Sequence, residues 1–212
     1  MLYVIHPGGL SPSCWSRIFA HLPAGTPVRV EELETITSYW ADDPGLTVDA
    51  LADRLRAGLR ADRPRLLVGW GVGGVVADAL AARMPQPPRR VVVLDSLAPG
   101  ACGEPELERS FAAHAAALGR NPSPRAYEQH ARRVRRDHRL TEGSTPSGLP
   151  LTVVKAHAGL APESRALGWE RHAPVEVLAA AGDHYSMLTD AAAAIQLALL
   201  LQRWLAPAYA AA

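Results

Sequence analysis

The sequence predicts an α/β fold with a mostly parallel central sheet and helices on both of its faces. Short apolar runs rich in β-branched residues, typical of buried strands, occur at residues 2–6, 27–30, 65–70, 90–95, 151–155 and 175–178. Helical patterns occupy residues 47–61, 72–84, 105–118, 125–136 and 191–204. Strands that alternate with helices form parallel sheets covered on both faces, because each crossover helix packs against the sheet.

The length and composition indicate one ordinary globular domain, which we expect to span residues 1–212. Hydrophobic residues make up 48% of the chain and charged residues 20%, which argues against a disordered or membrane-spanning protein. The 22 Lys and Arg residues balance 21 Asp and Glu residues, so no general positive field attracts nucleic acid or an anionic membrane. Cys14 and Cys102 lack metal or redox spacing, and the first residues lack a secretory signal. We therefore expect a cytoplasmic protein.

The third predicted strand leads into a glycine-rich turn at residues 69–74, Gly-Trp-Gly-Val-Gly-Gly, and then into a helix. A strand, a tight turn and a helix in this order form the nucleophile elbow, G-x-S-x-G. Gly69 and Gly73 suit it, because neighbouring side chains in so tight a turn would collide. Gly71 stands where the elbow carries its serine.

Two further strand ends offer partners for this turn, and ligands of parallel sheets bind beyond the carboxyl ends of the strands. The fourth predicted strand ends in Asp95, a carboxylate that could orient an imidazole. Residues 182–188, Gly-Asp-His-Tyr-Ser-Met-Leu, place His184 just before the last helix. The order elbow, Asp, His is the chain order of the α/β-hydrolases.

Taken together, these pieces resemble the thioesterases of polyketide and nonribosomal peptide biosynthesis, both stand-alone and chain-terminating. The resemblance covers nearly the whole chain and rests on His6-Pro7-Gly8-Gly9, Gly69-Trp70-x-x-Gly73-Gly74, Val93-Leu94-Asp95-Ser96 and the block at 182–188. It implies an α/β-hydrolase fold with a short helical lid at about residues 103–150.

The resemblance also implies roles for individual residues. In that family a serine at the position of Gly71 takes the acyl or peptidyl group from the phosphopantetheine arm of a carrier protein. The equivalent of His184 is its base, the equivalent of Asp95 orients that base, and amides matching Gly8 and Val72 form the oxyanion hole. A carrier protein is thus the implied partner, with no cofactor and no metal. The chain starts at its first strand and ends soon after its last helix, so we expect no carrier domain of its own.

Gly71 rules out the family's covalent mechanism for this chain, since it has no hydroxyl or thiol to form an acyl-enzyme. Removing the nucleophile of such a triad typically costs on the order of 10⁶-fold in turnover. Ser96, Ser186 and Cys14 are the alternative nucleophiles near the predicted site. We interpret the two serines as loop hydrogen-bonding groups and the cysteine as a small buried apolar residue.

Three interpretations of Gly71 remain open. The protein is an enzyme in which His184, held by Asp95, acts as general acid or base in hydrolysis, cyclisation or rearrangement. Alternatively, it is a non-catalytic protein that binds a carrier-bound intermediate. The third interpretation is a serine thioesterase inactivated by replacement of its nucleophile. Incubation with a simple acyl thioester separates a hydrolase from a non-hydrolase, and a serine codon at position 71 of the native gene would identify the third case.

Several aromatic residues are candidates for the pocket wall. His6 and Trp70 flank the predicted oxyanion loop and elbow, where they are candidate substrate contacts. A histidine at a strand end is more often a structural hydrogen-bonding group, so that role stays open for His6. Trp40 and Trp169 are predicted to belong to the core or to the pocket wall.

An arginine cluster lies on a predicted lid helix, at Arg132, Arg133, Arg135 and Arg136. Its simplest interpretation is a solvated helix surface. The functional alternative is a docking surface for an acidic carrier protein or for the phosphate of its phosphopantetheine arm.

Overall fold

The computed structural model describes residues 1–59, 64–118 and 123–205. Within them lies a six-stranded sheet with the strand order β2-β1-β3-β4-β5-β6, in which every neighbouring pair is parallel. The sheet confirms the predicted α/β class. Its strands are β1 Leu2–His6, β2 Val28–Glu32, β3 Leu66–Trp70, β4 Arg90–Leu94, β5 Leu151–Ala158 and β6 Val175–Asp183.

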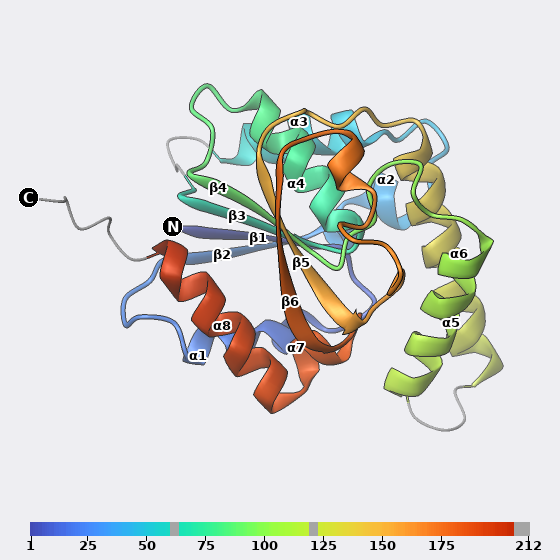
Figure 1. The fold of residues 1–212 in the computed structure, drawn as a ribbon. Helices are drawn as coiled ribbons and strands as arrows, with labels where there is room; N and C mark the ends of the chain where they lie inside the picture. Colours follow the sequence, from blue (N-terminus) through green and yellow to red (C-terminus); the bar gives the residue numbers. More distant parts are fainter. Residues whose placement is uncertain (60–63, 119–122, 206–212) are drawn as a thin grey trace, which may run out of the picture.

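The helices lie between and after these strands (Figure 1). Short 3₁₀ turns occur at η1 Pro12–Trp15, η2 Leu33–Thr35 and η3 Trp169–Arg171. The α-helices are α1 Ser16–Ala20, α2 Thr37–Trp40, α3 Val48–Gly58, α4 Val72–Arg83, α5 Glu104–Leu118, α6 Pro124–Glu142, α7 Ser186–Thr189 and α8 Ala191–Leu205.

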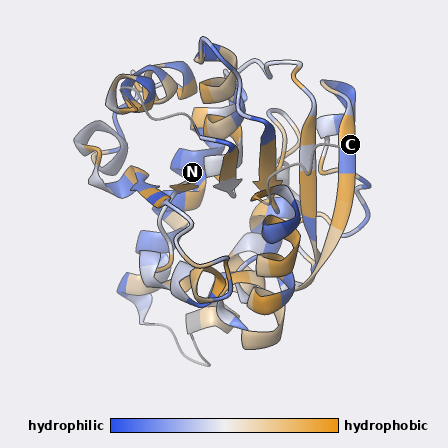
Figure 2. Cartoon of the chain, turned by 90° about the vertical axis from the view of Figure 1, so that its left-hand side faces the viewer, coloured by the Kyte–Doolittle hydropathy of each residue, from blue (hydrophilic) through white to orange (hydrophobic). Residues whose placement is uncertain are grey.

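Alternating side chains of the strands divide the core into two layers, one on each face of the sheet. Tyr3 and Ile5 of β1 belong to the cluster that includes buried residues of α3 and α4. Leu2 and Val4 of the same strand belong to the cluster that includes Ile18 of α1 and residues of α8. Figure 1 shows α3 and α4 on one side of the sheet and α1 and α8 on the other, and Figure 2 shows the strands as mostly hydrophobic. Burial of both strand faces explains why the strands are continuous apolar runs.

The observed elements differ from the predicted ones mainly at their ends. β5 and β6 extend beyond the predicted runs, because their last residues include several alanines, which carry little strand signal. The predicted helix at 125–136 begins one residue earlier and continues to residue 142. The helix predicted over 47–61 is observed as Val48–Gly58, and residue 61 lies outside the described residues. The short helices α1, α2 and α7 were not predicted, because four or five residues show no helical period.

Helices α5 and α6 lie between β4 and β5 in the chain, within the stretch predicted as the lid. Ser123 caps α6 by accepting a hydrogen bond from the Ala126 amide, with Pro124 in the first turn. Figure 1 shows both helices at the end of the sheet where β1 to β4 point, beyond their carboxyl ends. We call residues 104–142 the α5–α6 segment; residues 119–122 within it are not described. None of the described helices is long and apolar enough to cross a membrane.

Candidate active site

A sharp turn at Gly71 connects β3 to α4 and forms the base of the candidate site. Gly71 has φ 54° and ψ −132°, a left-handed conformation that suits glycine. A Cβ at Gly69 would overlap with the Gly73 carbonyl group, and a Cβ at Gly73 would overlap with the Ile5 carbonyl oxygen. The predicted need for glycine at 69 and 73 is therefore confirmed.

The imidazole of His184 faces this turn from the loop between β6 and α7. A Cβ built on Gly71 would lie 3.4 Å from Cε1 and 3.5 Å from Nε2 of His184. On the other side of the ring, Nδ1 lies 2.9 Å from Oδ2 of Asp95, and both side chains are buried. Because a carboxylate only accepts, Nδ1 carries the proton and Nε2 presents its lone pair toward Gly71. The structure thus brings together the three residues that the sequence singled out.

Backbone amides hold the Asp95 carboxylate in place after β4. Asp95 is fully buried, with φ 41°, so the chain turns sharply where the strand ends. Its Oδ1 accepts a hydrogen bond from the Ala156 amide (3.2 Å) and its Oδ2 one from the Leu160 amide (3.4 Å). A Cβ at Gly159 would overlap with Oδ1 and lie 2.8 Å from Cγ. Only glycine at 159 therefore leaves room for the carboxylate in this position.

Trp70 packs against the His184 imidazole from beside the elbow. Its ring stacks on that of His184 with centroids 4.8 Å apart, and its Nε1 donates to the His184 carbonyl oxygen at 3.0 Å. Trp70 also lines the pocket, as expected for a candidate substrate contact.

His6 does not line the pocket, contrary to its candidacy as a substrate contact. The residue is fully buried and stacks on Trp70, with centroids 5.6 Å apart. Its Nδ1 accepts from Trp15 Nε1 at 3.2 Å, and its Nε2 donates to the Leu10 carbonyl oxygen at 2.8 Å. Burial also lowers the pKa of His6, which favours this neutral form. The structural alternative therefore holds: His6 supports the loop that follows β1.

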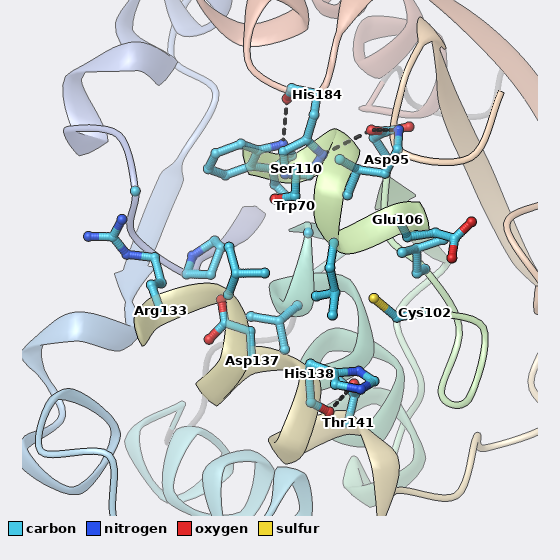
Figure 3. Close-up of a pocket in the computed structure, with 18 of the residues that line it drawn as sticks. Trp70, Asp95, Cys102, Glu106, Ser110, Arg133, Asp137, His138, Thr141 and His184 are labelled. Atoms are coloured by element: carbon cyan, nitrogen blue, oxygen red, sulfur yellow. Dashed lines mark hydrogen bonds and ion pairs between the residues drawn. The ribbon is translucent and has the colours of Figure 1, made fainter. Parts of the chain in front are cut away.

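A pocket of about 100 Å³ lies between the elbow and the α5–α6 segment (Figure 3). Gly8 and Val72 both line it next to Gly71, where the oxyanion hole was predicted. The Glu34 carboxylate fills the space that any side chain at position 8 would need. The backbone of Gly8 has φ 99°, which also favours glycine. Apolar wall residues are Leu97, Leu107, Val134 and Leu160. The polar wall includes Arg133, which the sequence placed in a candidate docking cluster, and a set of residues that the sequence did not predict as wall residues: Cys102, Glu106, Ser110, His130, Asp137, His138, Thr141 and Tyr185.

The alternative nucleophiles lie in different surroundings. Ser186 Oγ accepts a hydrogen bond from the Asp183 amide at 2.7 Å, as predicted for a loop serine. Ser96 is fully buried, but its hydroxyl has no hydrogen-bond partner among the described residues, so the prediction was wrong for it. Cys14 is partly exposed and does not line this pocket, and burial raises the pKa of its thiol to about 12. Cys102 does line the pocket, and burial raises the pKa of its thiol to about 11, which keeps it protonated at neutral pH.

The arginine cluster of α6 is split between two environments. The Arg136 guanidinium is buried over the Tyr39 ring, 3.7 Å from its centroid, and Nε donates to Asp137 Oδ1 at 3.0 Å. Arg133 Nε donates to Glu34 Oε1 at 2.9 Å. Arg132 and Arg135 are exposed. The interpretation as a uniformly solvated helix was therefore wrong, because two of the four side chains hold α6 against the body of the protein.

Trp40 and Trp169, the other two tryptophans considered for the core or the pocket wall, lie in different environments. Trp169 is fully buried in the core, and its Nε1 donates to the Ser96 carbonyl oxygen at 2.7 Å. Trp40 is 62% exposed, so its assignment to the core or pocket wall was wrong. It ends the short helix α2, which carries no periodic signal that could have placed it.

Comparisons with known proteins show the fold. No family model matches the chain. A pimeloyl-[acyl-carrier protein] methyl ester esterase of Aromatoleum aromaticum is 37% identical over 93 residues, which cover 44% of this chain and only 36% of that protein. The RedJ thioesterase of the prodiginine pathway in Streptomyces coelicolor has a TM-score of 0.68 at 19% identity, over 95% of this chain and 88% of that one. The NocB thioesterase domain, solved in covalent complex with a fluorophosphonate nocardicin G analogue, has a TM-score of 0.67 at 21% identity, over 97% and 94%.

The six-stranded parallel sheet, its covering helices and these similarities define an α/β-hydrolase fold. Within that fold, the chain is similar along most of its length to the thioesterases named above.

Proposed function

We propose that this protein is a thioesterase-like enzyme that acts on an acyl or peptidyl group attached to the phosphopantetheine arm of a carrier protein. It works without a serine nucleophile, through general acid–base chemistry by His184 and Asp95. One observation carries the proposal: Nδ1 of His184 is hydrogen-bonded to Asp95, while Nε2 of the same ring faces the space above Gly71. A site without chemistry has no physical need for this buried pair.

The space above Gly71 suits a water molecule as the nucleophile. A cavity holds a water when it offers about 10–15 Å³ by the same measure, and the pocket offers about 100 Å³. His184 Nε2 takes a proton from the water while its oxygen attacks the thioester carbonyl carbon. Collapse of the tetrahedral intermediate breaks the carbon–sulfur bond, and the imidazolium returns the proton to the leaving thiolate. The products are a carboxylic acid and the free thiol of the carrier.

Neighbouring groups stabilise the charges of this reaction. Asp95 stabilises the His184 imidazolium through the 2.9 Å hydrogen bond, as the acid of a catalytic triad does. The amides of Gly8 and Val72, at the wall beside Gly71, are proposed to stabilise the oxyanion. If a hydroxyl or amine of the acyl chain occupies the position of the water, the same proton transfers give a cyclised or rearranged product.

Two other functions are compatible with a glycine at position 71: an inactivated serine thioesterase, and a protein that only binds a carrier-bound intermediate. Incubating the natural form and Gly71→Ser with acyl-carrier protein, and following the acyl group by intact mass spectrometry, separates the three. Turnover by the glycine form supports the proposed enzyme. Turnover by Gly71→Ser alone shows an inactivated thioesterase. Binding without turnover by either form shows a binding protein.

A further inference from the structure

The two edge strands of the sheet differ in how well they are protected from further pairing. β2, at one edge, has three charged residues among its five, Arg29, Glu31 and Glu32. Charged side chains and prolines on an edge strand discourage another strand from adding to the sheet. β6, at the other edge, has the sequence Val-Leu-Ala-Ala-Ala-Gly over residues 177–182, with no charge and no proline. The β6 edge is therefore open to another strand.

The free backbone groups of this edge belong to alternate residues. The Leu151 amide donates to the Pro174 carbonyl oxygen, and Leu151 is the register partner of Val175, so the N–H and C=O groups of Val175 point away from β5. The same holds for Val177 and Ala179, because the register between the two strands is regular over this stretch. Among the described residues, no group bonds to these outward N–H and C=O groups.

Helix α8 lies beside the open edge and exposes apolar side chains next to it. The Ala181 amide, which is the next outward one, donates to Oε1 of Gln196 in α8 at 3.0 Å (Figure 1). Leu199 lies one turn after Gln196 on the same side of α8, and Ile195 lies one turn before Leu199. Ile195 is 40% exposed and Leu199 is 54% exposed. The edge thus combines unpaired backbone groups with an exposed apolar helix surface.

The free groups of β6 are complementary to those of the same strand in a second copy of the chain. In an antiparallel pair centred on Val177, this residue lies opposite its own equivalent, and Val175 lies opposite Ala179 of the second copy. Opposed residues of this kind exchange two N–H···O=C bonds, so the pairing satisfies the outward groups of all three. Glu176 then lies opposite Leu178 instead of another acid, and Arg90 already pairs with its carboxylate.

The same symmetry brings the two apolar helix surfaces together. Directly opposed residues of an antiparallel pair have their side chains on the same face of the sheet, so the two-fold axis is perpendicular to the sheet. Leu178 and buried residues of α8 belong to the core layer of one face. Both copies of α8 therefore lie on that face, next to each other, with Ile195 and Leu199 of each directed toward the other helix. A second copy supplies a free strand and an apolar helix surface at once, which favours it over an unrelated partner.

We propose that two copies of the protein associate through antiparallel pairing of their β6 strands and contact between their α8 helices, which joins the two sheets into one. The contact is the same on both copies, and the charged β2 strands form the outer edges of the joined sheet, so assembly stops at the dimer. No residue of β6 or α8 lines the pocket, so the dimer does not depend on the proposed chemistry.

The mass of the natural protein in solution tests the dimer. Size-exclusion chromatography with multi-angle light scattering, between about 1 and about 100 µM, should show the mass of two chains at the upper end of this range. Hydrogen exchange followed by NMR should show the amides of Val177 and Ala179 protected in the dimer. A monomer over the whole range would overturn the proposal, and protected amides in that monomer would show that a segment of the same chain covers the edge.

A proline on the edge tests the strand pairing. Ala179→Pro removes one outward N–H from each copy and no bond to β5, and edge strands tolerate proline at such positions. We expect the dissociation constant of the dimer to rise by about tenfold or more, because the two-fold axis makes each substitution count twice. Ala179→Ser, which keeps the N–H, is the matched control and should retain the dimer.

A charge on α8 tests the helix contact independently. Leu199→Glu places two carboxylates against each other in the dimer and should give a monomer with an unchanged circular dichroism spectrum. Ala57→Glu, at an exposed position of α3 on the other face of the sheet, is the control and should remain dimeric. A dimer that withstands both Ala179→Pro and Leu199→Glu uses another surface and would overturn the proposal. Should the proline variant not fold, Leu199→Glu and the mass of the natural protein still decide.

Discussion

A side chain at Gly71 would place its Cβ 3.5 Å from Nε2 of His184. This is an ordinary van der Waals distance, so a serine at this position would meet the imidazole without displacing it. The remaining obstacle is the backbone, since φ 54° is strained for a residue with a side chain. Nucleophile elbows carry that strain routinely. The turn, the base and the carboxylate are therefore arranged for a hydroxyl that the chain lacks.

Restoring this hydroxyl should create a reactive serine. We expect Gly71→Ser to form a stoichiometric adduct with a fluorophosphonate probe, because His184 and Asp95 are already placed to activate it. Gly71→Ala introduces the same backbone strain without the hydroxyl and is the matched control. Intact mass spectrometry measures the adduct.

The natural protein should remain unlabelled under the same conditions. The Ser186 hydroxyl oxygen accepts a hydrogen bond within its loop, and Ser96 is fully buried. The raised pKa values of Cys14 and Cys102 keep both thiols protonated. A stoichiometric adduct on any of these four residues would show that another nucleophile operates.

Displacing Asp95 without mutating it tests its orienting role. In Gly159→Ala, the new methyl group would overlap with the Asp95 carboxylate and disturb its bond to His184. We expect turnover of a carrier-bound substrate to fall by about 10²-fold, the lower end of what a positioned acid–base group contributes. Gly143→Ala, where a Cβ meets nothing within 4 Å, is the control. Equal turnover in the two variants would exclude a role for the carboxylate.

A hydrogen bond between Tyr39 and Asp137 connects α2 to the α5–α6 segment. The Tyr39 hydroxyl lies 2.8 Å from Asp137 Oδ1 and 3.1 Å from the Pro7 carbonyl oxygen. Tyr39→Phe should lower the free energy of unfolding by about 1–3 kcal/mol, because the partly buried carboxylate loses a donor. Tyr127→Phe removes a hydroxyl from a side chain that is 49% exposed and should change it by less than about 0.5 kcal/mol. Urea unfolding at pH 7 measures both; equal stabilities would show that the bond contributes nothing.

Two buried histidines, His114 in α5 and His130 in α6, stack with ring centroids 3.6 Å apart and should make the protein acid-sensitive. Burial lowers their pKa values to about 4 and about 3 in the folded protein, below the ordinary value of 6.5. Between pH 6.5 and about 4, the unfolded chain therefore binds protons that the folded chain does not, and stability falls as the pH falls. The melting temperature should drop between pH 7 and pH 5, and by less in His130→Leu than in the natural protein. An equal drop in both would contradict the assigned direction; His157→Leu, at an exposed position, controls for the loss of a histidine.

The fold was largely predictable because the parallel strands are buried on both faces. Residues 2–5 alternate between the two core layers, yet all four are hydrophobic, so the run is visible without knowledge of the faces. Helices α3 and α8 repeat over three or more turns and were predicted for the same reason. Single-turn helices have no period, so α2 and the exposed Trp40 at its end could not be placed.

The candidate site was predictable only where it follows strand ends. Asp95 and His184 each follow a strand of one parallel sheet, so chain order was enough to bring them together. The burial of His6 depends on hydrogen bonds to Leu10 and Trp15, which a local pattern does not reveal. The stack of His114 on His130 depends on how two helices pack against each other, which periodicity does not fix.

Turnover by His184→Ala tests the central claim most directly. An acyl-carrier protein carrying a thioester is incubated in H₂¹⁸O with the natural protein, with His184→Ala, and with His157→Ala as a control for an exposed histidine. Intact mass spectrometry follows the loss of the acyl group and the ¹⁸O content of the released acid. We predict turnover by the natural protein and by His157→Ala, with one ¹⁸O in any hydrolysed product, and a loss of about 10²- to 10⁴-fold in His184→Ala. Equal turnover by the natural protein and His184→Ala would contradict acid–base catalysis by His184.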